Sequence, residues 1–156
     1  MKNRFLFLGI IFSLISCTSQ KEEKIVELDS IHRYYKALAK EIPSDLFNTC
    51  AKQNSLRGLL DKSYITPKIH SSIMGVWGPY QNTCQIVENE LGTILNYNLY
   101  KIVDKGIVYH FYYSLDTEKG EKAILKLVLN KEYGLSEFHI YTYTNEKYNN
   151  ILFPKE

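Results

Sequence analysis

The chain has 156 residues, and its 19 lysines and arginines barely outnumber its 17 aspartates and glutamates. Two of the basic residues, Lys2 and Arg4, lie in an N-terminal segment that we expect to be removed, so the remaining chain has equal numbers of basic and acidic residues. A neutral chain without runs of like charge lacks the clustered basic residues that bind nucleic acid, so we expect no nucleic-acid partner. Residues 17–156 are enough for one domain with a hydrophobic core.

Residues 1–16 have the pattern of a bacterial export signal. A basic start precedes an apolar run over residues 5–15, which is shorter than the roughly 20 apolar residues of a membrane-spanning helix. The run ends in LISC, residues 14–17, which resembles the lipobox of bacterial lipoproteins. That resemblance implies cleavage before Cys17, acyl chains such as palmitate on this cysteine, and stable membrane anchoring. An ordinary signal peptide with a chance cysteine is the alternative.

The acylated Cys17 and a polar tether are expected to occupy residues 17–27. The sequence TSQKEEK, residues 18–24, contains no apolar side chain and predicts a solvated linker. Thr18 rather than Asp follows the cysteine, so the usual inner-membrane retention signal is missing. KEE, residues 21–23, resembles an export signal of surface lipoproteins in some Gram-negative bacteria, although such a run is equally typical of a plain spacer. We therefore expect a protein anchored by its acyl chains in the bacterial cell envelope, at the periplasmic or surface face of the outer membrane.

The first half of the expected domain, residues 28–156, has helical patterns. Apolar residues three and four apart predict a helix over 28–42, and Pro43 is expected to end it, because proline disfavours helical geometry in the residue before it. Ser44 and the residue after it are expected to open a second helix. A short helix is expected over 67–74, with proline at its first position.

The second half has the patterns of strands. The chain from residue 94 onward contains short turns of three to five residues, and such short connections join antiparallel neighbours. We therefore predict an α+β fold, in which N-terminal helices pack on one face of a curved four- to five-stranded antiparallel meander. The predicted strands cover residues 81–88, 94–103, 107–115, 123–130 and 135–144.

Two segments in this half resemble a known family. WGPY, residues 77–80, and LNKEYGLSEFHIY, residues 129–141, are similar to small cystatin-like domains related to nuclear transport factor two. Several such domains of unknown function occur in bacterial lipoproteins. The resemblance implies a curved sheet around one long helix, often with a conical pocket, and it departs at residues 135–137 in the order of polar and apolar residues. Because the family includes enzymes, ligand binders and proteins without known chemistry, it does not by itself supply a function.

Cys50 and Cys84 are the two cysteines left after the lipobox. In an oxidising exported compartment they can form a disulfide, which the chain-entropy model values at roughly 3–4 kcal/mol. The alternative is two buried free thiols that behave as small hydrophobes. Their spacing excludes a C-x-x-C redox pair.

No hydrolase, phosphate-loop, dinucleotide or metalloprotease motif is present, so we expect a non-enzymatic protein with no metal and no cofactor. A hydrolase or metal-dependent enzyme stays as a further alternative. It depends on Glu137, His139 and His110 converging on one side of the sheet, whereas such residues are more often ordinary polar strand positions.

The 13 tyrosines are the most unusual feature of the composition. Many fall on predicted strands, where tyrosine is a good structural residue, but aromatic rings with polar tips also line binding sites. We expect a domain that binds a small ligand or a peptide, and the alternative is a pocketless interaction protein or accessory subunit of an envelope complex. The candidate pocket lining is Trp77, Tyr80, Tyr109, Phe111, Tyr113 and His139.

Overall fold

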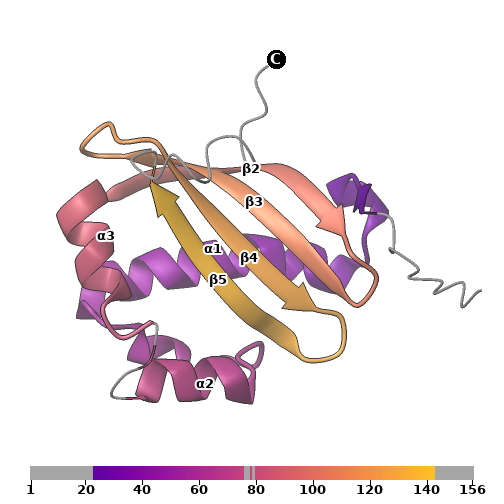
Figure 1. Cartoon of the computed structure of the whole chain (residues 1–156), viewed down its shortest axis with the longest axis horizontal. Helices are drawn as coiled ribbons and strands as arrows, with labels where there is room; N and C mark the ends of the chain where they lie inside the picture. The colour runs from indigo at the N-terminus through magenta and orange to yellow at the C-terminus, as the bar shows by residue number, and fades with distance from the viewer. Residues whose placement is uncertain (1–22, 76–77, 79, 143–156) are drawn as a thin grey trace, which may run out of the picture.

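The computed structural model describes residues 23–75, 78 and 80–142 (Figure 1). Cys17 with the segment predicted to be an export signal, Trp77, and the last two residues of the strand predicted over 135–144 lie outside the described residues. The chain has the α+β fold that we predicted, with helices first and an open antiparallel sheet after them. The sheet has five strands in the order β1-β2-β3-β4-β5.

The sheet is a meander in which each strand pairs with the next one along the chain. Four of the predicted strands are present, and their register is antiparallel throughout. Phe111 lies opposite Ile102 on one side and Leu127 on the other, and Leu127 lies opposite Phe138. The strands are β1 (Lys24–Ile25), β2 (Ile94–Asp104), β3 (Val108–Thr117), β4 (Ala123–Asn130) and β5 (Gly134–Thr142).

Strand β1 corrects the prediction that residues 17–27 form only a solvated tether. Lys24 lies opposite Asp104, and Ile25 lies opposite Val103, so the domain begins inside the expected linker. The backbone of β2 offers unpaired hydrogen-bonding groups at the edge of the meander, and even a polar segment can pair with such an edge.

One long helix, α1 (Arg33–Gln53), replaces the two helices predicted on either side of Pro43. A short 3-10 turn, η1 (Leu28–Ser30), precedes it. Pro43 has no N–H to donate to the carbonyl of Ala39 one turn earlier, which is why proline usually interrupts a helix. Here the hydroxyl of Tyr113 on β3 donates to that carbonyl at 2.7 Å and replaces the missing partner.

The helices after α1 include one correct and one wrong prediction. Helix α2 (Pro67–Met74) has the predicted bounds, and the hydroxyl of Thr66 accepts a hydrogen bond from the N–H of Ile69 at its start. A 3-10 turn, η2 (Leu56–Leu59), lies between α1 and α2. Residues 81–88 were predicted as a strand, but the structure has helix α3 (Thr83–Leu91) there, because Cys84, Val87 and Leu91 are spaced by three and four residues and are buried on one side of the helix.

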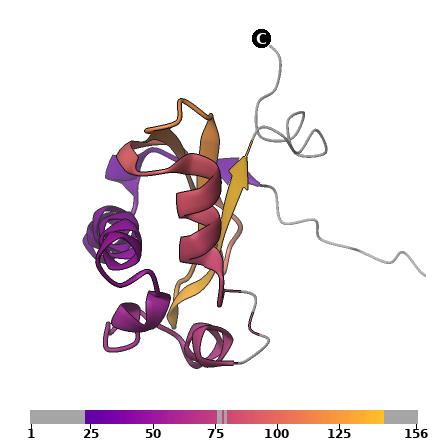
Figure 2. The ribbon, with the colours of Figure 1, turned by 90° about the vertical axis from the view of Figure 1, so that its left-hand side faces the viewer.

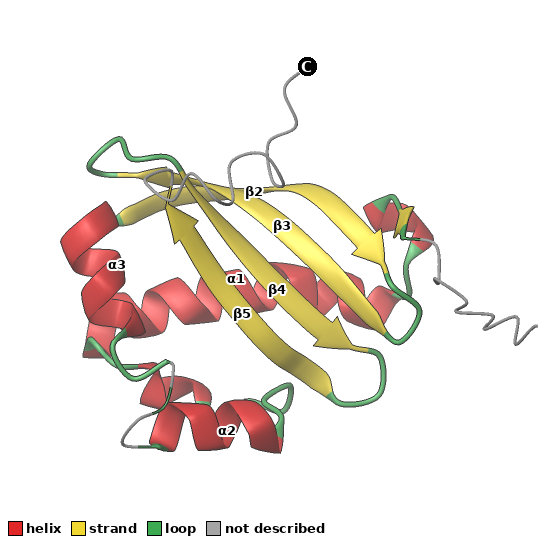
Figure 3. Cartoon of the chain, in the orientation of Figure 1, coloured by secondary structure: helices red, strands yellow, loops and turns green. Residues whose placement is uncertain are grey.

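The helices cover one face of the sheet (Figures 2 and 3). Helix α1 runs across this face, and the side chains of Ile42 and Leu46 are buried with Phe111, Leu127 and Phe138 in one hydrophobic core. None of the helices within the described part of the chain lies on the opposite face (Figure 2). On the opposite face Val103, Ile124 and Val128 are also buried, with 4%, 1% and 6% of their surface exposed, so the described helices account for the covering of one face only.

A disulfide joins Cys50 near the end of α1 to Cys84 in the first turn of α3, with a Cα–Cα distance of 5.0 Å. Of the two alternatives for these cysteines, the structure has the disulfide. It ties α3 to the long helix rather than to the sheet, which determines where α3 stands relative to β5.

Candidate functional site

The first half of the outer edge of β5 is covered by the chain that precedes α2 and α3. The N–H of Leu135 donates to the carbonyl of Tyr64 at 2.8 Å, and the hydroxyl of Thr66 donates to the carbonyl of Leu135 at 2.8 Å. Further along, the N–H of Phe138 donates to the hydroxyl of Tyr80 at 3.3 Å. Each of these contacts satisfies a main-chain group that an edge strand would otherwise leave unpaired.

The covering stops after Phe138. Main-chain groups along an antiparallel strand face its neighbour and its free side alternately. Because the N–H of Phe138 faces the free side, the N–H and the carbonyl of Ile140 face it as well. No hydrogen bond joins these two groups of Ile140 to another residue within the described part of the chain. As far as residues 23–142 are described, this stretch of β5 is therefore an open strand edge.

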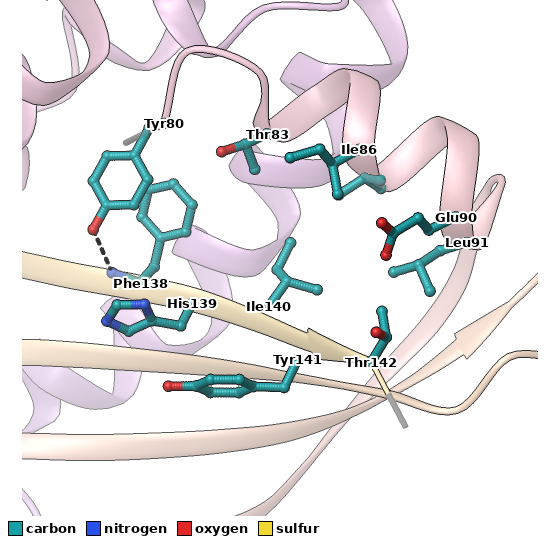
Figure 4. Close-up of a pocket in the computed structure, with 11 residues that line it drawn as sticks. Tyr80, Thr83, Ile86, Glu90, Leu91, Phe138, His139, Ile140, Tyr141 and Thr142 are labelled. Carbon is teal, nitrogen blue, oxygen red and sulfur yellow. Dashed lines mark hydrogen bonds between the residues drawn. The ribbon is translucent and has the colours of Figure 1, made fainter. Parts of the chain in front are cut away.

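Helix α3 stands across from this open edge and forms the other wall of a groove of about 260 Å³ (Figure 4). The helix presents side chains three and four residues apart to the groove, which is the spacing of one helical face. Its lining combines apolar side chains from both walls, such as Leu91 and Ile140, with polar side chains such as Thr83 and Glu90. The eleven lining residues are Tyr80, Thr83, Ile86, Val87, Glu90, Leu91, Phe138, His139, Ile140, Tyr141 and Thr142.

Contacts at both ends of α3 hold it in this place. The disulfide of Cys84 fixes its first turn to α1. At its other end Gly92 has a φ of 70°, a conformation that suits glycine, and this turns the chain into β2. The carboxylate of Glu118 then accepts hydrogen bonds from the N–H and the hydroxyl of Thr93, at 3.1 and 2.8 Å. The groove is thus formed by a helix and a strand that tertiary contacts hold in place, and not by a loop.

Tyr80 closes one end of the groove. Its ring stacks on that of Phe138 with centroids 4.1 Å apart and planes 16° apart. Burial raises the pKa of the Tyr80 hydroxyl, so the group stays protonated over the physiological range. The hydroxyl oxygen accepts from the main chain of β5, and its own proton remains available to a ligand.

The charged groups at the groove lie on opposite sides of it. On the β5 side, Glu137 pairs with Lys68 at 2.6 Å and contacts His139 at 3.6 Å. The hydrogen bond from Lys68 is the main reason why the pKa of Glu137 is lowered, and His139 adds to the effect. On the helix side, Glu90 is the one acidic side chain among the eleven that line the groove. The groove therefore presents the exposed carboxylate of Glu90 on α3, whereas the charge of Glu137 beside β5 is already paired with that of Lys68.

The structure assigns the predicted pocket residues to two different places. Tyr80 and His139 do line the groove. Phe111 and Tyr113 instead fill the core, where they are 0% and 1% exposed, and Tyr109 packs against that core. This corrects the prediction of a lining by Tyr109, Phe111 and Tyr113, because their face of β3 is the face that α1 covers.

The sequence pattern missed the helix wall of the groove and the role of Ile140. The residues of α3 were assigned to a strand, so their common face was not recognised. The spacing of Cys84, Val87 and Leu91 was the signal that could have identified it. The open edge at Ile140 had no sequence signal, since it depends on where Tyr80 stops covering β5.

His110, Glu137 and His139 lie on one face of the sheet, but among the described residues they do not form a cluster that could hold a metal ion. His110 and Glu137 lie on β3 and β5 with Val128 of β4 between them. His139 does contact Glu137, but no group of three or more His, Cys, Asp or Glu side chains in residues 23–75, 78 and 80–142 is arranged to hold a metal ion.

A second cavity of about 440 Å³ lies beside the disulfide, between the end of α1 and the start of β2. It is larger than the groove, and Asn48, Asn54 and Glu88 are among its lining residues. Ile94 is the one strand residue in its lining, whereas the groove is lined by five consecutive residues of β5, Phe138 to Thr142. We therefore take the groove at β5 as the candidate site.

Comparisons with protein-family models, with curated proteins and with solved structures give no match for this chain. Within the described part of the chain, no helix has both the length and the apolar character that crossing a membrane would require. The site must therefore be interpreted from its own chemistry.

Proposed function

We propose that this chain is a lipid-anchored protein of the bacterial cell envelope whose domain binds an extended peptide. The peptide lies in the groove between α3 and β5 and adds to the sheet as a further strand. The observation that carries this proposal is the open edge at Ile140, whose N–H and carbonyl face the groove, whereas the N–H of Phe138 and both main-chain groups of Leu135 already have partners. Strand addition is a common mode of peptide recognition, in which main-chain hydrogen bonds supply affinity and side-chain pockets supply specificity.

The dimensions of the groove support a peptide over a compact small molecule. Sites that enclose a small molecule usually measure about 300–1,000 Å³. The groove has a volume of about 260 Å³, and one of its walls is a strand edge. An elongated ligand can make hydrogen bonds along such a wall, while a compact ligand would leave part of it unpaired.

The side chains around the groove define which peptide fits best. Val87, Leu91 and Ile140 provide apolar surface for side chains on one face of the added strand. Glu90 on the helix wall is an exposed carboxylate and suits a lysine or arginine of the peptide. The favoured ligand is thus an extended segment of alternating apolar and polar residues with one basic side chain.

Selection from a peptide library displayed on phage tests this proposal. The bait is the mature chain, residues 17–156, with Cys17→Ser to prevent acylation. We expect enrichment of alternating sequences with a basic residue. In the complex, the amide of Ile140 should exchange with solvent at least tenfold more slowly than in the free protein, because it becomes hydrogen-bonded to the peptide.

Two variants at one position separate main-chain from side-chain recognition. Ile140→Pro removes the outward N–H and should abolish binding of the selected peptides, and proline is tolerated on edge strands. Ile140→Ala keeps the N–H and should weaken binding only by the loss of apolar contact. No enriched peptide, or equal binding by Ile140→Pro and the parent protein, would overturn strand addition.

A further inference from the structure

A row of cationic and aromatic side chains crosses the face of the sheet that no described helix covers. Lys101 on β2 lies opposite Tyr112 on β3, Tyr112 lies opposite Lys126 on β4, and Lys126 lies opposite His139 on β5. Residues directly opposite one another share a face of the sheet. Tyr113, the next residue along β3, points into the core, so this row points away from α1.

Lys126 is the unusual member of this row. It lies in the middle of a central strand, and burial together with the charge of Lys105 lowers its pKa below the usual value. The carboxylates whose charges act on it, Glu23 and Glu137, pair with Lys105 and Lys68 instead. A half-buried ammonium group without a paired carboxylate is costly, and an anion from outside the chain would offset that cost.

Two further side chains of this face, Tyr112 and His110, lie beside Lys126. The ring centroid of Tyr112 lies 5.7 Å from the Nζ of Lys101 and 6.0 Å from the Nζ of Lys126, so one ring has two ammonium groups around it. The buried Nδ1 of His110 has no hydrogen-bond partner among the residues that the structure describes. Burial, Lys126 and Lys105 lower the pKa of His110 to about 4, so its ring is neutral at physiological pH. We call the positions Lys101, His110, Tyr112 and Lys126 the cationic face.

The described part of the chain begins at this same face. Glu23, the first described residue, forms an ion pair with Lys105 and also acts electrostatically on Tyr112. Ile25, two residues later, is 67% exposed. Five residues separate Cys17 from Glu23. Even when fully extended, this stretch spans only about 20 Å, so an anchored Cys17 keeps the cationic face close to the bilayer.

We propose that the cationic face binds the phosphate groups of anionic phospholipids in the membrane that holds Cys17. The charge of the face and the short tether at its edge both favour this occupant over a soluble one. Each lysine near an anionic bilayer strengthens binding about fivefold, so the two lysines orient the anchored domain rather than anchor it. The inference rests on the lipid anchor proposed above, and it is independent of the peptide groove.

Vesicle cosedimentation tests this proposal with the unacylated mature chain, residues 17–156 with Cys17→Ser. We expect binding to vesicles made of equal amounts of phosphatidylcholine and phosphatidylglycerol, and loss of this binding at high salt. The double variant Lys101→Gln/Lys126→Gln should bind about thirtyfold more weakly. The matched control Lys40→Gln/Lys52→Gln removes the same charge from exposed positions of α1 and should bind as the parent protein does.

Three results would overturn the proposal. One is equal weakening by both double variants, and another is equal binding to vesicles of phosphatidylcholine alone. The third is a shift of the His110 ring resonances by inorganic phosphate without any binding to anionic vesicles, which would assign the face to a soluble anion. Lys126→Arg keeps the charge and must keep the binding, which controls for misfolding. The assay uses a chain without acyl groups. A negative result therefore contradicts lipid binding by the cationic face but not the proposed lipid anchor, which is tested separately.

Discussion

At the scale of single residues, Pro43 and Tyr113 depend on each other. Proline inside α1 leaves the carbonyl of Ala39 without its helical donor, and Tyr113 donates to that carbonyl at 2.7 Å from the sheet. Burial raises the pKa of Tyr113 far above its usual value, so its hydroxyl remains a donor. One hydrogen bond thus compensates for an irregular residue in the helix and fixes α1 against β3.

We expect Tyr113→Phe to lower the free energy of unfolding by about 1–3 kcal/mol, because the buried carbonyl of Ala39 then has no partner. The loss should shrink in a Pro43→Ala background, where residue 43 regains an N–H that can donate to the same carbonyl. Urea unfolding of the two single variants and the double variant measures this coupling. Tyr97→Phe is the matched control, since the Tyr97 hydroxyl has no hydrogen bond to a residue of the described chain. Additive effects in the cycle would contradict this account.

At the scale of the elements, the disulfide positions the helix wall of the groove. Cys84 lies in the first turn of α3 and is 3% exposed, and its bond to Cys50 closes a loop with a sequence separation of 34 residues. Helix α3 has only 9 residues, and such short helices are marginal without tertiary contacts. The groove at β5 therefore depends on a covalent link to the opposite helix.

Reduction of this disulfide should lower the free energy of unfolding by about 3–4 kcal/mol, because the open loop regains conformational entropy in the unfolded chain. Thermal unfolding with and without a reducing agent measures the effect. The double variant Cys50→Ala/Cys84→Ala should melt at the lower temperature in both conditions. The same melting temperature for the oxidised and reduced parent protein would show that the bond contributes nothing to stability.

At the scale of the whole molecule, the proposed anchor, the cationic face and the groove occupy different parts of the domain. Glu23, where the described chain begins, pairs with Lys105 at the side of the sheet that no described helix covers, while the groove lies between β5 and α3. Because His139 lies opposite Lys126 and also lines the groove, a domain that rests on its cationic face would hold the groove at the edge of its contact with the bilayer. This arrangement connects the two proposals without making either one depend on the other.

Cys17→Ser should release the protein from membranes and abolish labelling with palmitate, because the acceptor thiol of the proposed lipobox is lost. Cell fractionation and metabolic labelling in a Gram-negative host measure both effects. Ser16→Ala is the control, since it leaves the cysteine in place and should stay membrane-bound and labelled. Membrane association that survives Cys17→Ser would refute the lipid anchor.

The periodic part of the fold was predictable from local sequence. Strand patterns with short turns between them predicted the antiparallel meander, and proline at the first helical position predicted α2 at its observed bounds. Residues 81–88 were assigned wrongly, because a short apolar run fits both a strand and a helix and tertiary packing decides between them. Pro43 was wrongly expected to end a helix, since its compensating donor lies 70 residues away on β3.

The sequence by itself determined the α+β class, the order of helices before strands and the neutral charge of the chain after its first residues. Those properties follow from periodicity, turn chemistry and composition, which are local or additive. Only the tertiary structure decided that Tyr109, Phe111 and Tyr113 belong to the core, and that the edge of β5 stays open at Ile140. Which face a helix covers and where a strand edge ends depend on contacts between segments far apart in the chain, and no local pattern contains them.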